Sequence, residues 1–386
     1  MMTERLYYKD SHMAEFTATV ISCEKSGDNY EVVLDRTAFF PEGGGQAADT
    51  GILGQTKVVD VQEKDGVIRH FTEDALEAGS KVEGVIDWQQ RFSRMQQHTA
   101  EHVISGLIHA RFGYENVGFH LNDEICTLDM NGPVTKEELQ EIENEANEAV
   151  FACIPVEVSY PSKEELQTLE YRSKIEIEGQ VRIVTIPGYD VCACCAPHLS
   201  NTGEIGLIKI INTQNYKGGV RLTIVCGRRA LKDYQSKEVS VRKIMFSLSS
   251  KEELIADAVE KMKEETTVLK SRLSEMQREI LQMKVLGIKE GEDKVCLFEK
   301  ELEGNGPREL MNMVLERQVK ICGVFAGTDE TGYRYVIGSR TEDVRPLGKA
   351  LNQGFNGRGG GKPEMVQGSL KGEKEKIEQY FTEVQC

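Results

Sequence analysis

Two histidines four residues apart, His98 and His102, constrain this chain more than any other feature. Apolar residues recur at helical spacing around them, from Met95 to Ile108, and predict a helix over residues 90–113. Residues four apart on a helix lie on the same face, one turn above each other. Both imidazoles can therefore reach a single metal ion, although two ordinary surface or core histidines would show the same spacing.

A second motif supplies the ligands that two histidines leave open. Zinc in proteins is usually held by four nitrogen and sulfur ligands arranged as a tetrahedron. Residues 191–198 contain three cysteines and a histidine. Cys192 and Cys194 face the same side of an extended segment, so spacing alone leaves both as candidates. The sequence predicts a zinc site with four ligands, which are His98, His102, Cys194 and His198.

Composition sets the broad class of the protein. A chain of 386 residues can hold two to four domains. Its net charge of −16 argues against a generic nucleic-acid coat, so any RNA contact must come from local basic patches. No apolar run is long enough to be an export signal or a membrane span, and we expect a cytoplasmic protein. The ten cysteines then indicate thiols and metal ligands.

The fold class expected is α+β with several domains, the first of which is a small β-barrel-like domain at residues 1–90. Two hairpins are predicted there from alternating apolar residues. Between them lie Gly43, Gly44 and Gly45, with Thr37 before and Gln46 after. Three glycines leave the backbone open to a ligand or to a sharp turn. We interpret this glycine motif as one wall of a binding cleft, with an ordinary loop as the alternative.

Residues 91–240 are expected to form an α+β domain around the predicted metal site. Thr135 and Ser162 each begin a capping-box pattern that opens a helix. Strand-like runs alternate with these helices, which favours helices packed on a mostly antiparallel sheet.

Residues 241–290 are expected to form a helical arm. Apolar residues repeat every three and four positions over residues 255–283, which predicts a coiled coil. This arm would be either the zipper of a homodimer or an intramolecular spacer that packs on its own domain.

Residues 291–386 are expected to form an α/β domain. It contains a run of glycines interleaved with Arg358 and Lys362. Backbone amides beside two cations suit a phosphate group, so we predict that these residues bind substrate. A flexible glycine loop is the alternative.

The motifs, taken in order, resemble the editing domain of alanyl-tRNA synthetases. They resemble more closely the free-standing alanyl-tRNA editing proteins of the long form. The motifs concerned are residues 35–51, His98 with His102, and Cys194 with His198. The glycine run at residues 356–363 resembles the DHHA1 domain that ends both kinds of protein. Nothing in the sequence resembles a class II aminoacylation core, so we expect an editing protein without a synthetase.

The resemblance implies a hydrolase that deacylates mischarged tRNA(Ala), chiefly Ser-tRNA(Ala), with Gly-tRNA(Ala) as a candidate second substrate. It also implies zinc at the four predicted ligands, and a last domain that grips the tRNA. Thr37 and Gln46 match family positions near the aminoacyl end and are the expected catalytic residues. Thr37 is the candidate to hydrogen-bond the hydroxyl of a misattached serine. The sequence Cys194-Cys-Ala-Pro-His198 departs from the family's cysteine-glycine-glycine-threonine-histidine, which leaves the cysteine ligand open.

Two other classes of protein fit part of the pattern. A structural zinc protein could bind tRNA without catalysis. His98-Thr-Ala-Glu101-His102 also fits an inverted zinc-peptidase motif, with Glu101 as the base. Glu101 lies about 100° around the helix from His102, however, so we expect it on a solvated face. A DHHA1-type phosphoesterase needs an Asp-His-His motif, which the sequence lacks.

Overall fold

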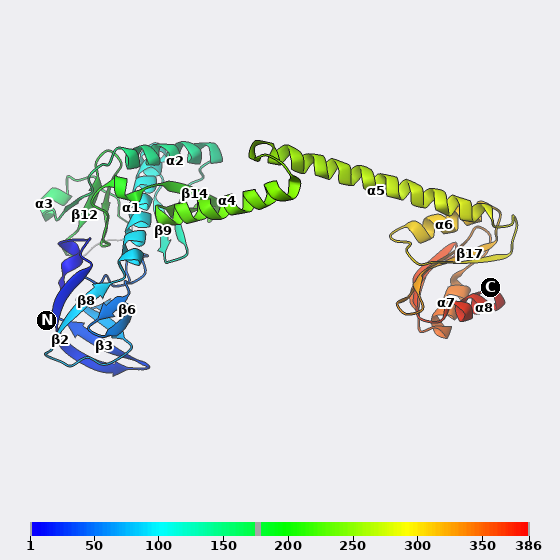
Figure 1. Cartoon of the computed structure of the whole chain (residues 1–386), viewed down its shortest axis with the longest axis horizontal. Coiled ribbons are helices and arrows are strands. Elements are labelled where there is room, and N and C mark those ends of the chain that lie inside the picture. The colour runs from blue at the N-terminus through cyan, green and yellow to red at the C-terminus, as the bar shows by residue number, and fades with distance from the viewer. Residues whose placement is uncertain (1, 174–178, 385–386) are drawn as a thin grey trace. The chain divides into compact units, whose positions relative to one another are not determined.

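The computed structural model describes residues 2–173 and 179–384, and its contacts divide the chain into two compact units, Met1–Ile244 and Met245–Cys386. The structure is mixed α and β with several sheets, which confirms the general fold class (Figure 1). The finer division at residues 90, 240 and 290 stays a prediction. Among the described residues, no helix is long and apolar enough to cross a membrane.

The first unit begins with six strands that pair in a closed ring. In ring order they are β2 (Glu15–Ser26), β3 (Asn29–Leu34), β7 (Val67–Thr72), β6 (Thr56–Lys64), β5 (Gly51–Leu53) and β8 (Lys81–Ile86). Alternate residues point inward, as in β8, where every second side chain is buried. β1 (Glu4–Arg5) pairs with β4 (Arg36–Thr37), and a short helix, η1 (Leu6–Tyr8), lies between them in sequence. The glycine motif connects β4 to β5.

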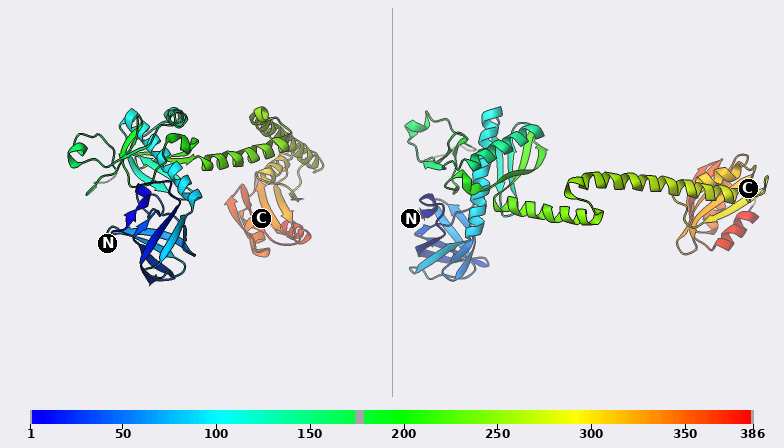
Figure 2. Two further views of the ribbon diagram at one scale, coloured as in Figure 1. Left: turned by 60° about the vertical axis from the view of Figure 1, so that its left-hand side comes forward. Right: turned by 45° about the horizontal axis from the view of Figure 1, so that its top comes forward.

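The long helix α1 (Trp88–Phe112) follows the barrel and organises the rest of this unit. Asp87 caps its first turn by accepting from the backbone of Gln90, and Gly113 ends it with φ of 70°. One end of α1 lies beside the barrel, and the other is surrounded by the sheet and α2 (Figure 2). Residues on every side of α1 are buried, which places it in the core.

An antiparallel sheet and a second small sheet surround α1. The larger sheet has the order β14 (Ile208–Tyr216), β15 (Gly219–Cys226), β10 (Cys126–Met130) and β9 (Asn116–Leu121). The smaller has the order β11 (Glu157–Ser159), β12 (Ile183–Ile186) and β13 (Asp190–Ala193). The helical elements are α2 (Lys136–Phe151), α3 (Lys163–Leu166), η2 (Thr202–Ile205) and α4 (Arg228–Leu248). Both predicted capping boxes are present, at Thr135 and Ser162, although α3 is a single turn.

The second unit is built on a five-stranded sheet. Its order is β16 (Lys294–Glu299), β17 (Ile321–Thr328), β18 (Gly332–Ser339), β20 (Met365–Leu370) and β19 (Arg358–Lys362). Its helices are η3 (Glu252–Leu254), α5 (Ile255–Leu286), α6 (Gly306–Leu315), α7 (Arg345–Gly354) and α8 (Lys374–Glu383). The glycine run that the sequence left as a possible loop is the edge strand β19, paired with β20.

Candidate metal centre

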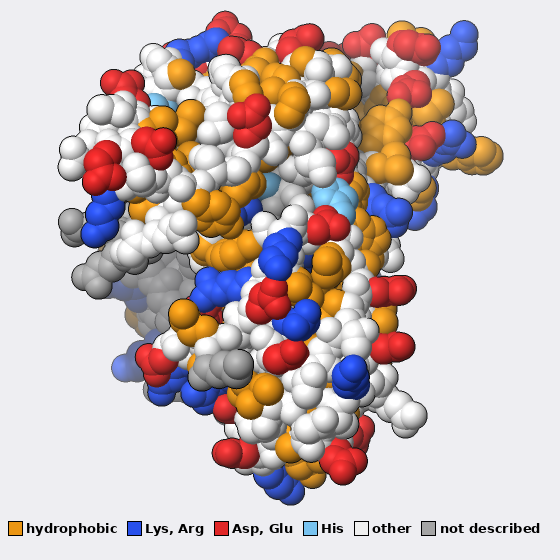
Figure 3. All heavy atoms as spheres, turned by 90° about the vertical axis from the view of Figure 1, so that its left-hand side faces the viewer, with side chains coloured by type: hydrophobic (Ala, Val, Ile, Leu, Met, Phe, Trp, Pro, Cys, Tyr) orange, Lys and Arg blue, Asp and Glu red, His pale blue; other side chains and the backbone are white. Residues whose placement is uncertain are grey.

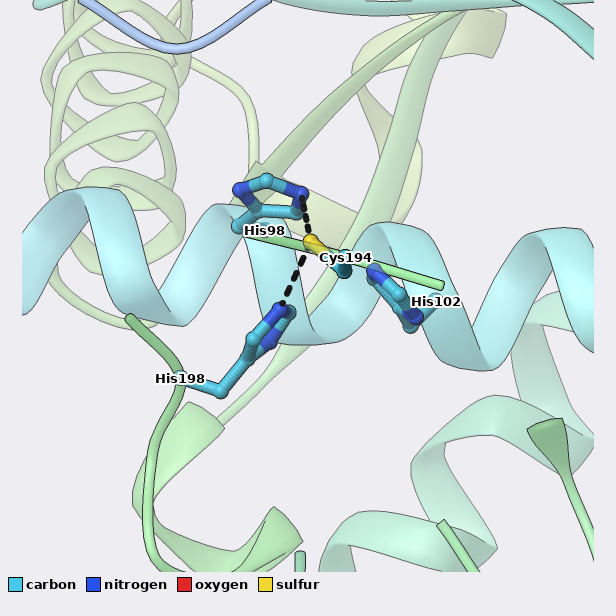
Figure 4. A group of neighbouring side chains, drawn as sticks. All are labelled: His98, His102, Cys194 and His198. Atoms are coloured by element: carbon cyan, nitrogen blue, oxygen red, sulfur yellow. Dashed lines mark hydrogen bonds between the residues drawn. The ribbon is translucent and has the colours of Figure 1, made fainter. Parts of the chain in front are cut away.

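Four side chains from two distant segments converge in the core of the first unit (Figure 4). They are His98, His102, Cys194 and His198, and their ligand atoms all lie within 4.8 Å of one another. The Cys194 Sγ atom is 3.6 Å from Nε2 of His98 and 3.3 Å from Nε2 of His198. Tetrahedral zinc with ordinary bond lengths would separate a nitrogen and a sulfur ligand by about 3.6 Å. The donor set and its spacing therefore fit zinc.

Hydrogen bonds on the far side of the rings fix which nitrogen faces the centre. His98 Nδ1 lies 2.8 Å from the Gln46 Oε1 atom, and His198 Nδ1 lies 3.1 Å from the Thr99 hydroxyl. When Nδ1 is held in this way, Nε2 is the nitrogen left to bind a metal. Both imidazoles are thus oriented before any ion binds.

His102 is held by a buried ion pair. Its Nδ1 atom lies 2.8 Å from Asp190, whose carboxylate also accepts two hydrogen bonds from Arg172, at 2.8 and 3.0 Å. Burial by itself would lower the pKa of His102, but the hydrogen bond to Asp190 raises it well above its usual value. A carboxylate behind a ligand histidine increases its basicity, as metal sites often require.

The electrostatics of the centre favour a thiolate on Cys194. Burial opposes its ionisation, yet the imidazoles of His98 and His198 bring the pKa of Cys194 well below its usual value. Burial lowers the pKa of His198 to about 3, which keeps that ring neutral. A thiolate and a neutral His198 are the forms that bind metals, and His102, whose pKa is raised, would release its proton when a metal binds. Burial instead raises the pKa of Cys192 to about 11, so Cys194 is the better ligand.

The backbone at Gly106 explains why β13 can approach α1 so closely. A Cβ atom there would lie 2.2 Å from the carbonyl oxygen of Tyr189, next to Asp190. Gly106 is one turn beyond His102 on the same helix. The missing side chain therefore lets the segment that carries Cys194 pack against the histidine pair.

The glycine motif borders the centre. Gly44 and Gly45 have positive φ values of 59° and 83°, which residues other than glycine rarely adopt. A Cβ atom on Gly44 would lie 3.5 Å from the Cys195 sulfur, and one on Gly45 would lie 2.3 Å from the carbonyl oxygen of Phe119. The loop thus lies against both the Cys194–His198 segment and β9, as a wall of the site would.

Gln46 joins this loop to the metal centre. Its side chain is fully buried, and Oε1 faces His98. Within residues 2–173 and 179–384, the Nε2 atom of Gln46 has no hydrogen-bond partner. A buried amide rarely leaves its donors unused. This nitrogen can therefore donate to an oxygen of a bound ligand.

Comparisons with known proteins agree with these features. The family described as "Threonyl and Alanyl tRNA synthetase second additional domain" matches residues 181–223, and "tRNA synthetases class II (A)" matches residues 2–90. The second match corrects the expectation that nothing in the sequence resembles a class II synthetase. The chain is 28% identical to the alanyl-tRNA editing protein Aarsd1 of Rattus norvegicus, over 94% of this chain and 93% of that protein. It is 27% identical to the alanyl-tRNA editing protein AlaX-L of Pyrococcus horikoshii, over 97% and 96%. The chain is a relative of the alanyl-tRNA editing proteins.

The resemblance seen in the sequence motifs is thereby confirmed. The chain is also 34% identical to an alanine–tRNA ligase of Ignicoccus hospitalis, over 72% of this chain and 32% of the ligase. It spans about a third of that ligase but nearly the whole of the two editing proteins.

The structure gives Thr37 partners outside the four-donor cluster. Its buried hydroxyl lies 2.8 Å from His70 Nε2 and accepts a hydrogen bond from the backbone of Phe39. Burial lowers the pKa of His70 to about 4, and its Nδ1 atom faces the carbonyl of Val32. The neutral ring therefore accepts from Thr37, whose single donor is used. A contact from Thr37 to a substrate hydroxyl stays a prediction.

The expectation that Glu101 lies on a solvated face is wrong. Glu101 is 1% exposed, and its carboxylate accepts hydrogen bonds from Ser105 and Asn116. The expectation treated α1 as a surface helix with one polar face, whereas α1 is enclosed on all sides. His109, in contrast, lies at the surface and forms an ion pair with Glu115.

Sequence reasoning missed the residues that support the donors. Asp190 and Thr99 contact ligand side chains, and Arg172 pairs with Asp190. None of the three belongs to a recognisable motif. Gly106 inside a helix was a usable signal, because glycine there often marks a close backbone approach.

The two basic residues predicted to bind substrate lie in the second unit. Arg358 and Lys362 begin and end the exposed edge strand β19. Lys362 also borders a cavity of about 570 Å³ that Arg308 and Arg340 line. Positively charged side chains therefore lie close to β19, which has glycine at three successive positions.

Proposed function

We propose that this chain is a trans-editing hydrolase that deacylates mischarged tRNA(Ala), chiefly Ser-tRNA(Ala), at a zinc centre. The observation that carries the proposal is the convergence of four metal donors beside a glycine-lined wall. It occurs in a chain related along its whole length to alanyl-tRNA editing proteins. Because its substrate would be tRNA used in translation, we expect the protein to act in the cytoplasm.

Such an activity answers a physical limit on synthetases. A pocket shaped for alanine cannot strongly reject serine, because an extra hydroxyl is discriminated by only about a hundredfold. A second site can select for that hydroxyl, since a polar group left unpaired costs about 1–3 kcal/mol. Correctly charged alanyl-tRNA, which lacks the hydroxyl, would then escape hydrolysis.

The proposed division of labour follows from the contacts. Zinc, when bound, would act either as a Lewis acid or as a structural ion that crosslinks the walls of the cleft. Four protein ligands are typical of structural zinc sites and favour the second role. Gln46 would donate from Nε2 to the ester carbonyl while Oε1 holds His98. The glycine wall at residues 43–45 would let the aminoacyl end approach the backbone, and Thr37 is the candidate for serine selection.

Deacylation of Ser-tRNA(Ala) by the purified protein tests the proposal. We expect hydrolysis of the seryl ester, little hydrolysis of Ala-tRNA(Ala), and loss of activity after treatment with a zinc chelator. Cys194→Ala should lose both zinc and activity. His109→Ala is the matched control, because His109 is on the same helix but partly exposed and outside the donor set. Binding of tRNA without any hydrolysis would instead favour a structural zinc protein.

The second unit would hold the tRNA body and pair with a second copy. Arg358 and Lys362 are the proposed phosphate contacts. Along α5 the predicted apolar stripe is exposed, for example Leu273 (58%), Met276 (60%) and Ile280 (52%). A long apolar stripe with charged flanks suits a coiled-coil dimer. Light scattering of the parent and of Leu273→Glu would show a dimer and a monomer if this is correct.

A further inference from the structure

Among the described residues, Arg182 is a buried cation without an acidic partner. It is 8% exposed, and no ion pair to it occurs among residues 2–173 and 179–384. The other buried arginines, Arg91, Arg94 and Arg172, each pair with an aspartate. A buried charge is stable only when a counter-charge and hydrogen bonds compensate for the lost water. A negatively charged ligand would supply the counter-charge that Arg182 lacks among the described residues.

The hydrogen bonds of Arg182 leave the Nε atom of its guanidinium group unpaired among the described residues. Nη1 donates to the carbonyl oxygens of Cys194, at 2.7 Å, and Ala196, at 3.0 Å. In the described part of the chain, the buried Nε atom has no acceptor. The Tyr8 ring lies 5.1 Å from the guanidinium carbon, within the range of a cation–π contact. The edge that carries Nε offers two parallel N–H donors, which suits bidentate binding of phosphate.

The Arg182 guanidinium group lies at the border of the proposed aminoacyl site. Cys194 contributes its thiol to the metal centre and its carbonyl to Arg182. The next residue, Cys195, is exposed and adjoins Gly44 of the glycine wall. A second guanidinium, from Arg5, lies 5.6 Å from the same Tyr8 ring. Figure 3 shows one face of the first unit, on which basic and hydrophobic side chains lie next to one another between the upper and lower parts.

We propose that Arg182 binds the phosphate on the 5′ side of the terminal adenosine of an aminoacyl-tRNA. The inference rests on the proposed function. In an aminoacyl ester the carboxyl group of the amino acid is no longer charged. The negative charge nearest to the ester is then the phosphate of the same nucleotide. Arg182 would place that nucleotide so that its ester lies at the metal centre and Gln46.

The test removes the phosphate charge and the guanidinium separately and together. Ser-tRNA(Ala) is prepared with either a normal phosphodiester or an uncharged methylphosphonate before the terminal adenosine. The parent should lose about tenfold in kcat/KM with the methylphosphonate, the effect of one charge-assisted contact. Arg182→Gln should be about tenfold slower on normal tRNA and show no further loss with the methylphosphonate. Arg111→Gln, which changes an ion-paired arginine at the C-terminal end of α1, should behave as the parent.

Equal rates of the parent on both substrates would overturn the proposal. The proposal would also be overturned if the losses in kcat/KM from Arg182→Gln and from the methylphosphonate multiplied when combined, because a purely structural role of Arg182 gives that result. If Arg182→Gln does not fold, Arg182→Lys replaces it in the test. Lysine keeps the positive charge but lacks the paired N–H donors of arginine, so this variant should show a smaller preference for the phosphodiester. Absence of deacylation on normal tRNA would count against the proposed function alone. In that case the phosphate contact would be tested by comparing the affinities of two tRNAs that carry no amino acid, one with the phosphodiester and one with the methylphosphonate.

Discussion

Replacement of Asp190 by asparagine should weaken metal binding without touching a ligand. Asp190 is 6% exposed and lies 2.8 Å from His102 Nδ1. Loss of a carboxylate behind a ligand histidine typically lowers metal affinity by about 10–100-fold, or about 1.4–2.7 kcal/mol. Asparagine can still accept from His102 but cannot neutralise the buried Arg172. We therefore also expect the free energy of unfolding of the metal-free protein to fall by about 3 kcal/mol.

The pH dependence of the metal-free protein gives a second measure of the same contact. Burial would raise the pKa of Asp190, but the hydrogen bonds from His102 and Arg172 hold it below its usual value. A lowered pKa means that the carboxylate stabilises the fold above the unfolded-state pKa of about 3.9. That contribution disappears as the pH falls through the lower folded-state value. Asp190→Asn should show a weaker loss of stability over this acidic range than the parent.

Competition for zinc with a chromophoric chelator would measure the affinity, and urea unfolding in the presence of EDTA would measure the stability. Asp293→Asn is a suitable control, because Asp293 forms an exposed ion pair with Lys320 in the second unit. If Asp190→Asn binds zinc within twofold of the control, the carboxylate does not support the centre.

Three further predictions address the loop, the tRNA grip and serine selection. Gly45→Ala should cost more than about 2 kcal/mol in urea unfolding, because φ is 83° and the new Cβ atom would meet a backbone carbonyl at 2.3 Å. Arg358→Ala with Lys362→Ala should weaken tRNA binding and reduce the slope of log affinity against log salt by about two; unchanged affinity would exclude β19 as the grip. Thr37→Val should lower the ratio of seryl to alanyl ester hydrolysis; a loss of stability with an unchanged ratio would leave Thr37 a purely structural role.

Local signals in the sequence predicted many secondary-structure elements. The alternation of apolar residues located the hairpins β2–β3 and β6–β7, and the Thr135 pattern located the start of α2. Each of these depends on residues close together in the chain. The ring closure of the barrel depends on the pairing of β2 and β5 with β8, which no local pattern specifies.

The donors were recognisable because each ligand type has specific chemistry, whereas their supports were not. An aspartate such as Asp190 or an arginine such as Arg172 occurs throughout any soluble chain. Only the fold shows that they meet behind His102. Glu101 illustrates the same limit, because its burial depends on how completely other elements enclose α1.

Arg182 and Gln46 show where structure adds most to a motif. Both are buried, and each has a nitrogen atom without a partner in the described residues. Stability alone would favour apolar or paired side chains at such positions. Both lie against the Cys194–His198 segment or its histidine partners. We infer that these unsatisfied donors are reserved for substrate oxygens, because sites that bind polar ligands leave such groups unpaired until the ligand arrives.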